Sequence, residues 1–507
     1  MHNPRMENTP SNSSETMPLG SPTRGWIVFA GVAMLVVFAH AMAAARWPVV
    51  VLPDSMDYAV SGARFLTAGN FDHMGTWRVP GFPLVFAFFL WFMRDPALGI
   101  GLLNAACVVA STLLTSVITG RRFGPWAGAA VLLLVGLDPV GFLYQRATMP
   151  ESLSTLVIVG IGAAVIAIGN GRTASRSAIR AAVLGLMLGA LVGLGCLLRP
   201  NFQVLLPWVA LAAGVVLWRM PSRAIAIVLG VVVGCGAVLL PWVLRTHQRS
   251  DRASLVVGAG ITRAISAVEV GMLDLDQPGT LTEPVRVSIL ARRQAGALGP
   301  YDLIDELTPM LSDTNPDRRR AELDALCASL ARESARRHPG RHAWHVARSF
   351  VNVSGLWPIN DTGYRENAWW ARAWLEPMTR DGNHHVAAGD YRELPEAEVR
   401  EIIRRTHAPM PRFSGVSAVL ARGWWVTWEW GRVGLVWLSL VGVVVCIRRG
   451  QVGLALVILA PMAHAAVLAG LTWAGIDRYG VPFLPLTMMG GVIGACVLVR
   501  AAQGREM

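Results

Sequence analysis

The chain has 507 residues, 53% of them hydrophobic, and a mean hydropathy of +0.45. This composition excludes an ordinary soluble domain and indicates an integral membrane protein. The formal net charge of +12 comes from 45 basic residues, all of them arginine, against 33 acidic residues. The arginines gather at the ends of apolar runs, where they orient membrane spans, so the positive charge does not indicate a nucleic-acid partner.

The amino-terminal part of the chain combines a polar tail with an anchor. Residues 1–22 are rich in Ser, Asn, Pro and Thr, and we predict a disordered cytoplasmic tail. Gly25–Ala45 follows, an apolar run of about 20 residues that is long enough to span a bilayer. This run is longer than the apolar part of a typical signal peptide and follows a long tail, so we interpret it as an uncleaved anchor.

The first predicted outer loop, residues 46–95, contains the most polar stretch between two apolar segments. That stretch, Pro53–Pro83, carries three carboxylates and Arg78, and it is too polar to enter lipid. The apolar segment that follows, Pro80–Met93, has only about 14 residues, which is short for a span. It therefore predicts a re-entrant or interfacial helix that does not cross the membrane.

Nine further apolar runs complete a predicted set of ten spans. They are Pro96–Thr119, Gly124–Tyr144, Leu153–Ile168, Ala181–Leu198, Phe202–Trp218, Ala224–Leu244, Val433–Ile447, Val452–Leu471 and Val481–Val499. The positive-inside rule then places Arg121 and Arg122 in the cytoplasm, the first loop outside and both termini in the cytoplasm. Arg146 and Arg199 are exceptions to this rule. A crossing by the short segment after the first loop would put Arg121 and Arg122 outside, and we reject it for that reason.

Residues 246–431 are predicted to form a mainly helical extracytoplasmic domain between a membrane module of residues 23–245 and the carboxyl-terminal membrane helices of residues 432–507. Most acidic residues fall in this domain, and no apolar run there is long enough to span. Arg318–Arg337 predicts a helix with charges on one face, and the apolar spacing of Arg341–Ser354 is typical of a helix lying on the membrane surface. Four tryptophans before the next span predict an interfacial aromatic belt. They are Trp424, Trp425, Trp428 and Trp430.

Ionisable residues gather in the predicted outer loops. The acids are Asp54, Asp57, Asp72 and Glu151, and the cations include Arg78, Arg199, Arg245 and Arg478. A carboxylate at a membrane face suits a general base that deprotonates a hydroxyl nucleophile. Arginine suits the phosphate of a lipid-linked leaving group, because its planar guanidinium binds phosphate oxygens in a fork. Simpler interpretations stay open: Asp54 or Glu151 could cap a helix, and Arg199 or Arg245 could anchor a span at the interface.

Metal and nucleotide chemistry have little support in the residues. The chain has no Gly-rich nucleotide loop, no HExxH and no CxxC. His384 and His385 are adjacent, but neighbouring histidines in a solvated loop are usually not metal ligands. We therefore name no metal-binding residue.

Several short motifs resemble one family in their order and spacing. They are Asp54-Ser-Met-Asp-Tyr58, Arg78-Val-Pro-Gly-Phe-Pro83, Met149-Pro-Glu-Ser152, Leu198-Arg-Pro200, Pro241-Trp-Val-Leu-Arg245 and Arg478-Tyr479. With them the chain resembles the GT-C membrane glycosyltransferases, in the bacterial branch related to protein O-mannosyltransferases and lipid A aminoarabinose transferases (family 39-like). The resemblance covers most of the membrane part and is loose in residues 246–431. One departure is Arg245-Thr246, where the family usually has Arg-Asn.

The resemblance implies a polytopic all-α GT-C fold and an inverting transfer from a polyprenyl-phosphate sugar. It implies a catalytic acid in the first loop, which corresponds to Asp54, with Asp57 as the second choice and Glu151 in a second acidic position. The residues expected to bind the substrate are Tyr58, Arg78, Arg199, Arg245, Arg478 and Tyr479. No cofactor is certain, and a divalent cation stays open.

We therefore predict a hexosyl- or pentosyltransferase of the bacterial inner membrane that acts on its outer face. The acceptor is expected to be a hydroxyl of a cell-envelope glycan, lipid or protein. Two alternatives stay open: a polyprenyl-linked lipid flippase or transporter, and a non-catalytic membrane protein of envelope assembly. A transporter normally places polar residues inside its spans, whereas the predicted spans here are nearly free of charge.

Overall fold

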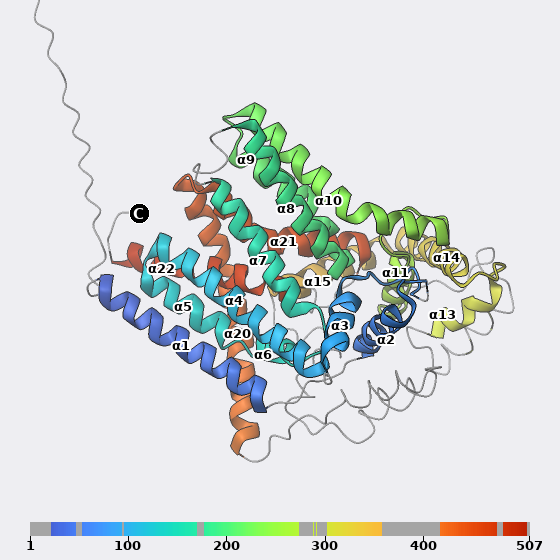
Figure 1. Ribbon diagram of the computed structural model, residues 1–507, viewed down its shortest axis with the longest axis horizontal. Coiled ribbons are helices and arrows are strands. Elements are labelled where there is room, and N and C mark those ends of the chain that lie inside the picture. The colour runs from blue at the N-terminus through green and yellow to red at the C-terminus, as the bar shows by residue number, and fades with distance from the viewer. Residues whose placement is uncertain are drawn as a thin grey trace, which may run out of the picture.

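The computed structural model describes most of the chain, and every regular element in its described part is a helix (Figure 1). The described residues are 22–46, 53–72, 74–93, 96–169, 177–272, 287, 291, 302–356, 416–473 and 480–503. Within them, eight helices are long and apolar enough to cross a membrane, or nine if one bent pair counts as a span. The predicted all-α polytopic fold is thus confirmed.

The long helices follow the predicted spans closely. Their bounds are α1 Pro22–Arg46, α4 Pro96–Phe123, α7 Glu151–Gly169, α8 Ala178–Leu198, α10 Pro221–Ser250, α20 Val416–Arg448, α21 Val452–Thr472 and α22 Leu484–Ala502, the last preceded by the 3-10 turn η6 Val481–Phe483. The short segment after the first loop is α3, Gly81–Phe92, and its 12 residues are fewer than a span needs. The polar stretch before it contains α2, Pro53–Ala68.

Two of the ten predicted spans differ from the structure. The run 124–144 is broken into α5, Pro125–Gly136, and α6, Pro139–Gln145, which are bent by 54°. Pro139 cannot donate a backbone hydrogen bond, and the carboxylate of Asp138 accepts one from the Val140 N–H at 3.1 Å, so a new helix begins there. The run 202–218 forms the 3-10 turn η1, Pro200–Val204, and a 12-residue helix α9, Leu205–Val216, which is too short to cross alone.

Helices α8 and α10 lie side by side and touch through glycines (Figure 1). A Cβ atom at Gly189 would lie 2.1 Å from the carbonyl oxygen of Val231, and one at Gly234 would lie 2.2 Å from that of Leu186. Only glycine permits this backbone approach, which is a common device of membrane helix pairs.

Helices α11 Ala259–Glu269, α13 Asp302–Leu307 and α14 Pro316–Arg337 lie near the end of α10 (Figure 1). The polar region also contains the 3-10 turn η2 Thr308–Met310 and helix α15 Pro339–Ser354. The predicted helix Arg318–Arg337 is confirmed within α14. Helix α10 continues without a break to Ser250, so the predicted domain boundary after residue 245 falls inside this helix.

Helix α15 packs along α21. His345 Nε2 lies 2.9 Å from the carbonyl oxygen of Trp473, and Val353 packs with Ala465 and Leu468, about one to two turns earlier in the chain. The predicted helix is therefore present and packs against a candidate span, while its position on the membrane surface stays a prediction. The predicted tryptophan belt is likewise part of a helix, because α20 already begins at Val416.

Candidate active site

Three predicted outer loops meet in one buried aromatic cluster. Tyr58 of α2, Phe82 of α3, Met149 before α7 and Leu198 at the end of α8 all belong to it. Helix α3 reaches α8 closely, because a Cβ atom at Gly81 would lie 2.4 Å from the carbonyl oxygen of residue 197. Residues far apart in the sequence are thereby brought to one end of the helix bundle.

An ion pair between Glu151 and Arg199 lies beside this cluster. A guanidinium nitrogen of Arg199 is 3.1 Å from a carboxylate oxygen of Glu151, and the side chains are 7% and 0% exposed. Arg199 has extended backbone angles between α8 and Pro200, while Glu151 is the first residue of α7. A buried ion pair is costly to desolvate and leaves a strongly unfavourable charge if one partner is removed. Each of these two predicted site residues therefore depends on the other to compensate its buried charge.

Arg78 and Tyr58 also come together as predicted site residues. The guanidinium carbon of Arg78 lies 5.3 Å from the centre of the Tyr58 ring and 4.3 Å from that of Trp77. Arg320 of α14 approaches Trp77 at 5.2 Å. Both distances to Trp77 are in the range of cation–π attraction. Trp77, which the motifs did not single out, thus connects Arg78 to the polar helices.

The structure describes only the backbone of the two candidate bases, Asp54 and Asp57. Both lie near the start of α2, Asp54 four residues before Tyr58 and Asp57 directly before it, and their side chains are outside the described residues. Arg478 and Tyr479 lie entirely outside the described residues, as do His384 and His385.

Arg245 contacts the first loop by hydrogen bonds to its backbone. Its guanidinium donates to the carbonyl oxygens of Phe71, at 2.6 Å, and Met74, and it stacks 4.4 Å from the Trp242 ring. These contacts hold the loop that leads to Arg78. Sequence reasoning placed Arg245 with the substrate phosphate and did not predict this role in supporting the loop.

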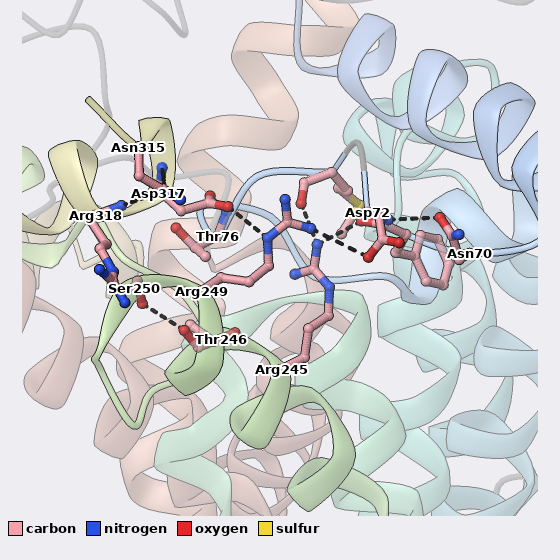
Figure 2. Close-up of polar contacts among 12 residues, drawn as sticks. Asn70, Asp72, Thr76, Arg245, Thr246, Arg249, Ser250, Asn315, Asp317 and Arg318 are labelled. Atoms are coloured by element: carbon pink, nitrogen blue, oxygen red, sulfur yellow. Dashed lines mark hydrogen bonds and ion pairs between the residues drawn. The ribbon is translucent and has the colours of Figure 1, made fainter. Parts of the chain in front are cut away.

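A neighbouring polar network was missed by sequence reasoning (Figure 2). Arg249 lies between two acids, with its Nε 2.7 Å from Asp317 Oδ2 and another guanidinium nitrogen 3.7 Å from Asp72 Oδ1. Asp317 Oδ1 also accepts the Thr76 backbone N–H at 3.0 Å. The carbonyl oxygen of Thr76 accepts in turn from the Val257 N–H at 2.8 Å. We call Arg249, Asp317 and Thr76 the loop clamp, because together they fasten the first loop to α10 and α14.

Among the residues with described positions, no group of three or more His, Cys, Asp or Glu side chains could hold a metal ion.

Comparison with known proteins finds similarity to solved structures only. No protein-family model matches the chain, and no curated protein matches its sequence. The chain is similar to ArnT from Cupriavidus metallidurans bound to undecaprenyl phosphate, at 14% identity over 95% of this chain and 79% of that chain, with a TM-score of 0.33. The apo state of the same protein gives 14% identity over 93% and 78%, with a TM-score of 0.35. The apo oligosaccharyltransferase of Archaeoglobus fulgidus gives 12% identity over 95% of this chain and 52% of that chain, with a TM-score of 0.43.

Proposed function

We propose that this chain is a GT-C type membrane glycosyltransferase that moves a sugar from a polyprenyl-phosphate donor to an acceptor hydroxyl. The observation that carries the proposal is the meeting of three motif-bearing loops in one place. Tyr58 and Arg78 from the first loop, Glu151 from the second and Arg199 from the third all border the same buried cluster. We place this site on the outer face of a bacterial inner membrane, with both termini in the cytoplasm.

The transfer is a single displacement with inversion. Asp54 accepts the proton of the acceptor hydroxyl, whose oxygen then forms a bond to the anomeric carbon of the sugar. The bond from that carbon to the phosphate oxygen breaks, and polyprenyl phosphate leaves with the electron pair. Asp57 is the alternative base.

The arginines of the site would offset the charge that develops on the leaving phosphate. Arg78 is the best placed of the described ones, because it is half-buried between aromatic rings in the first loop. Glu151 holds Arg199 in position and orients the acceptor. Arg478 and Tyr479 are assigned to the donor from the sequence motif alone.

A polyprenyl-linked lipid flippase is the second candidate. It is favoured by the position of Glu429 and Arg432 inside the candidate span of α20, where ionisable residues usually serve a function. The aspartates of the first loop separate the two candidates, because a flippase does not need a base there.

Substitution of Asp54 tests the proposal. Asp54→Asn keeps the size of the side chain but removes the basic carboxylate, so we expect turnover to fall by about 100-fold or more, the usual scale for a lost general base. Donor binding should change little, and Asp57→Asn should be milder. The assay is sugar transfer from a synthetic polyprenyl-phosphate donor in detergent, with donor binding measured on the same preparation.

Asp72→Asn is the matched control, because Asp72 is a first-loop carboxylate whose side chain is 81% exposed. It should keep near-normal turnover. Normal turnover in Asp54→Asn together with an inactive Asp57→Asn would show that Asp57 is the base instead of Asp54. Normal turnover in both variants would exclude a first-loop base.

A further inference from the structure

The middle of α15 is level with one end of a candidate membrane span. His345 and Ser349, one helical turn apart, both lie within hydrogen-bonding distance of the carbonyl oxygen of Trp473, at 2.9 and 3.2 Å. Trp473 follows the candidate span Val452–Leu471 of α21 by two positions. The part of α15 around residue 347 therefore lies at the level where the apolar part of α21 ends.

The second half of α15 is level with the interior of that span. Val353 packs with Ala465 and Leu468, and both of these residues lie inside the span, before its last residue, Leu471. At 1.5 Å per residue, the separation of three to six positions places them about 4–9 Å inside its end. Later residues of α15 thus contact earlier residues of α21, so the two helices run antiparallel. Helix α15 slopes from the end of the span toward its interior.

The deeper end of α15 has backbone groups that pair with each other. The N–H of Gly355 donates to the carbonyl oxygen of Asn352 at 3.2 Å, and the φ of Gly355 is 73°, as is common for a glycine that ends a helix. The N–H of Leu356 donates to the carbonyl oxygen of Val351, also at 3.2 Å. A hydrocarbon core contains no water, so a helix can end there only where the protein itself satisfies its last carbonyl groups. The turn after α15 meets this requirement for two of them.

The exposed side of α15 has the composition of a membrane contact. Trp344 is 70% exposed, and Ala343 and Ala347 beside it are exposed as well. Helix α15 contains no acidic residue and two arginines, Arg341 and Arg348, whereas α14 directly before it contains four acidic residues. Tryptophan and arginine close to the end of an apolar span are typical of the headgroup level of a bilayer. The long stem of Arg348 also allows its charged end to reach that level.

We propose that α15 is a re-entrant helix whose exposed side contacts lipid. Trp344 lies among the headgroups, and Val351, two turns further along, lies against acyl chains. The chain returns to the side from which it entered. A Cβ atom at Gly355 would lie 3.8 Å from Arg432 Nε, and α20 begins at Val416, about 24 Å before Arg432. Lipid is the partner that fits this side because it continues the apolar surface of a candidate span. The proposal does not depend on the transfer reaction.

Spin labels along the exposed side of α15 measure its depth. Ala343→Cys, Ala347→Cys and Val351→Cys are spaced by four residues, so they lie near one face of the helix at steps of about 6 Å. Each full-length variant is labelled with a nitroxide and reconstituted in vesicles of phosphatidylcholine and phosphatidylglycerol. Power-saturation EPR then compares collisions with oxygen, which concentrates in lipid, and with a water-soluble nickel chelate. The unmutated chain, labelled in parallel, gives the background of the six native cysteines, five of which are buried.

The ratio of oxygen to nickel collisions should rise along the helix, from residue 343 through 347 to 351. Two exposed alanines supply the matched controls. Ala325→Cys lies in the acidic helix α14 and should give a low ratio, because its label is in water. Ala30→Cys lies in the candidate span of α1 and should give a high ratio, because its label is in lipid.

Two outcomes would overturn the proposal. Equal ratios at the three positions would show that α15 lies parallel to the membrane surface instead of entering the membrane. Ratios as low as that of Ala325→Cys at all three would show that this side of α15 faces water. Val351 is the one labelled position that is partly buried. If Val351→Cys is not monodisperse, the step in the ratio between the exposed positions Ala343 and Ala347 decides the matter alone.

Discussion

The loop clamp makes a quantitative prediction about the first loop. Asp317 is 6% exposed and is the only described acceptor for the Thr76 N–H, while Thr76 is fully buried. Asp317→Ala leaves that amide buried and unsatisfied, which costs about 1–3 kcal/mol. The lost ion pair with Arg249 adds only about 0.2–1 kcal/mol, because the Arg249 side chain is 30% exposed and can be hydrated.

The free energy needed to open the first loop locally should therefore fall by about 2 kcal/mol, mostly because the Thr76 N–H loses its acceptor. Since about 1.4 kcal/mol is a factor of ten, the Thr76 amide should exchange its hydrogen about 30-fold faster. Hydrogen–deuterium exchange with mass spectrometry, read on peptides that cover residues 65–80, measures this local opening without requiring reversible unfolding of a membrane protein. Trp77 and Arg78 follow Thr76 directly, so the same peptides report on the loop that presents Arg78.

Two control variants separate the causes. Asp317→Asn keeps an oxygen that accepts from Thr76 but loses the charge and the oxygen that accepts from Arg249 Nε, so its exchange should rise by less than about fivefold. Arg318, the neighbour of Asp317 in α14, forms an exposed ion pair of 3.1 Å with Asp251 at the end of α10, and Arg318→Ala should leave the exchange unchanged. Unchanged exchange in Asp317→Ala, or equal acceleration in Asp317→Asn and Asp317→Ala, would refute the role assigned to the Thr76 hydrogen bond.

Two further predictions concern topology and pH. Reporter fusions after Arg122 should report the cytoplasm and those after Asp72 the outside; an outside signal after Arg122 would mean that α3 crosses and that the loops of the site lie on different sides. Burial, partly offset by the hydrogen bond to Trp473, lowers the pKa of His345 below its ordinary value of 6.5, and the nearby charges of Arg348 and His342 act in the same direction. His345 then binds a proton more readily in the unfolded chain than in the folded one. Its effect on the free energy of unfolding should be absent above pH 6.5, and the free energy of unfolding should decrease as the pH drops below that value. The melting temperature should therefore decrease between pH 7.5 and 5.5, and His345→Gln should reduce that decrease; an equal decrease in both proteins would contradict this role of His345.

The membrane helices could largely be predicted from the sequence, because the length of an apolar run decides whether it spans. The break at Asp138 was missed, since the run around it is apolar enough to hide one Asp-Pro pair. The close contact of α8 with α10 was missed as well. It depends on glycines of two helices facing each other, and their positions in each helix alone do not show this.

Sequence patterns named candidate site residues, but not the contacts that these residues make. Glu151 and Arg199 both stood in the predicted outer loops, but their pairing depends on how α7 and α8 pack. The loop clamp could not be foreseen, because Arg249 and Asp317 are 68 positions apart and Thr76 is 241 positions from Asp317. For Arg245, the motif indicated a cation, but only the fold shows that the first-loop carbonyl oxygens are its partners.

The position of charge within α20 bears on the choice between a transferase and a flippase. Arg432 lies 16 positions before the last residue of the helix, Arg448. At 1.5 Å per residue this is about 24 Å from the predicted cytoplasmic end. The hydrocarbon core of a bilayer is about 30 Å thick, so Arg432 lies near the predicted outer boundary. Residues 433–447, which fill the remaining depth, contain no charged side chain. A flippase must guide a charged headgroup through that depth, whereas a transferase with an outer site needs charge only at the outer end, where α20 carries it.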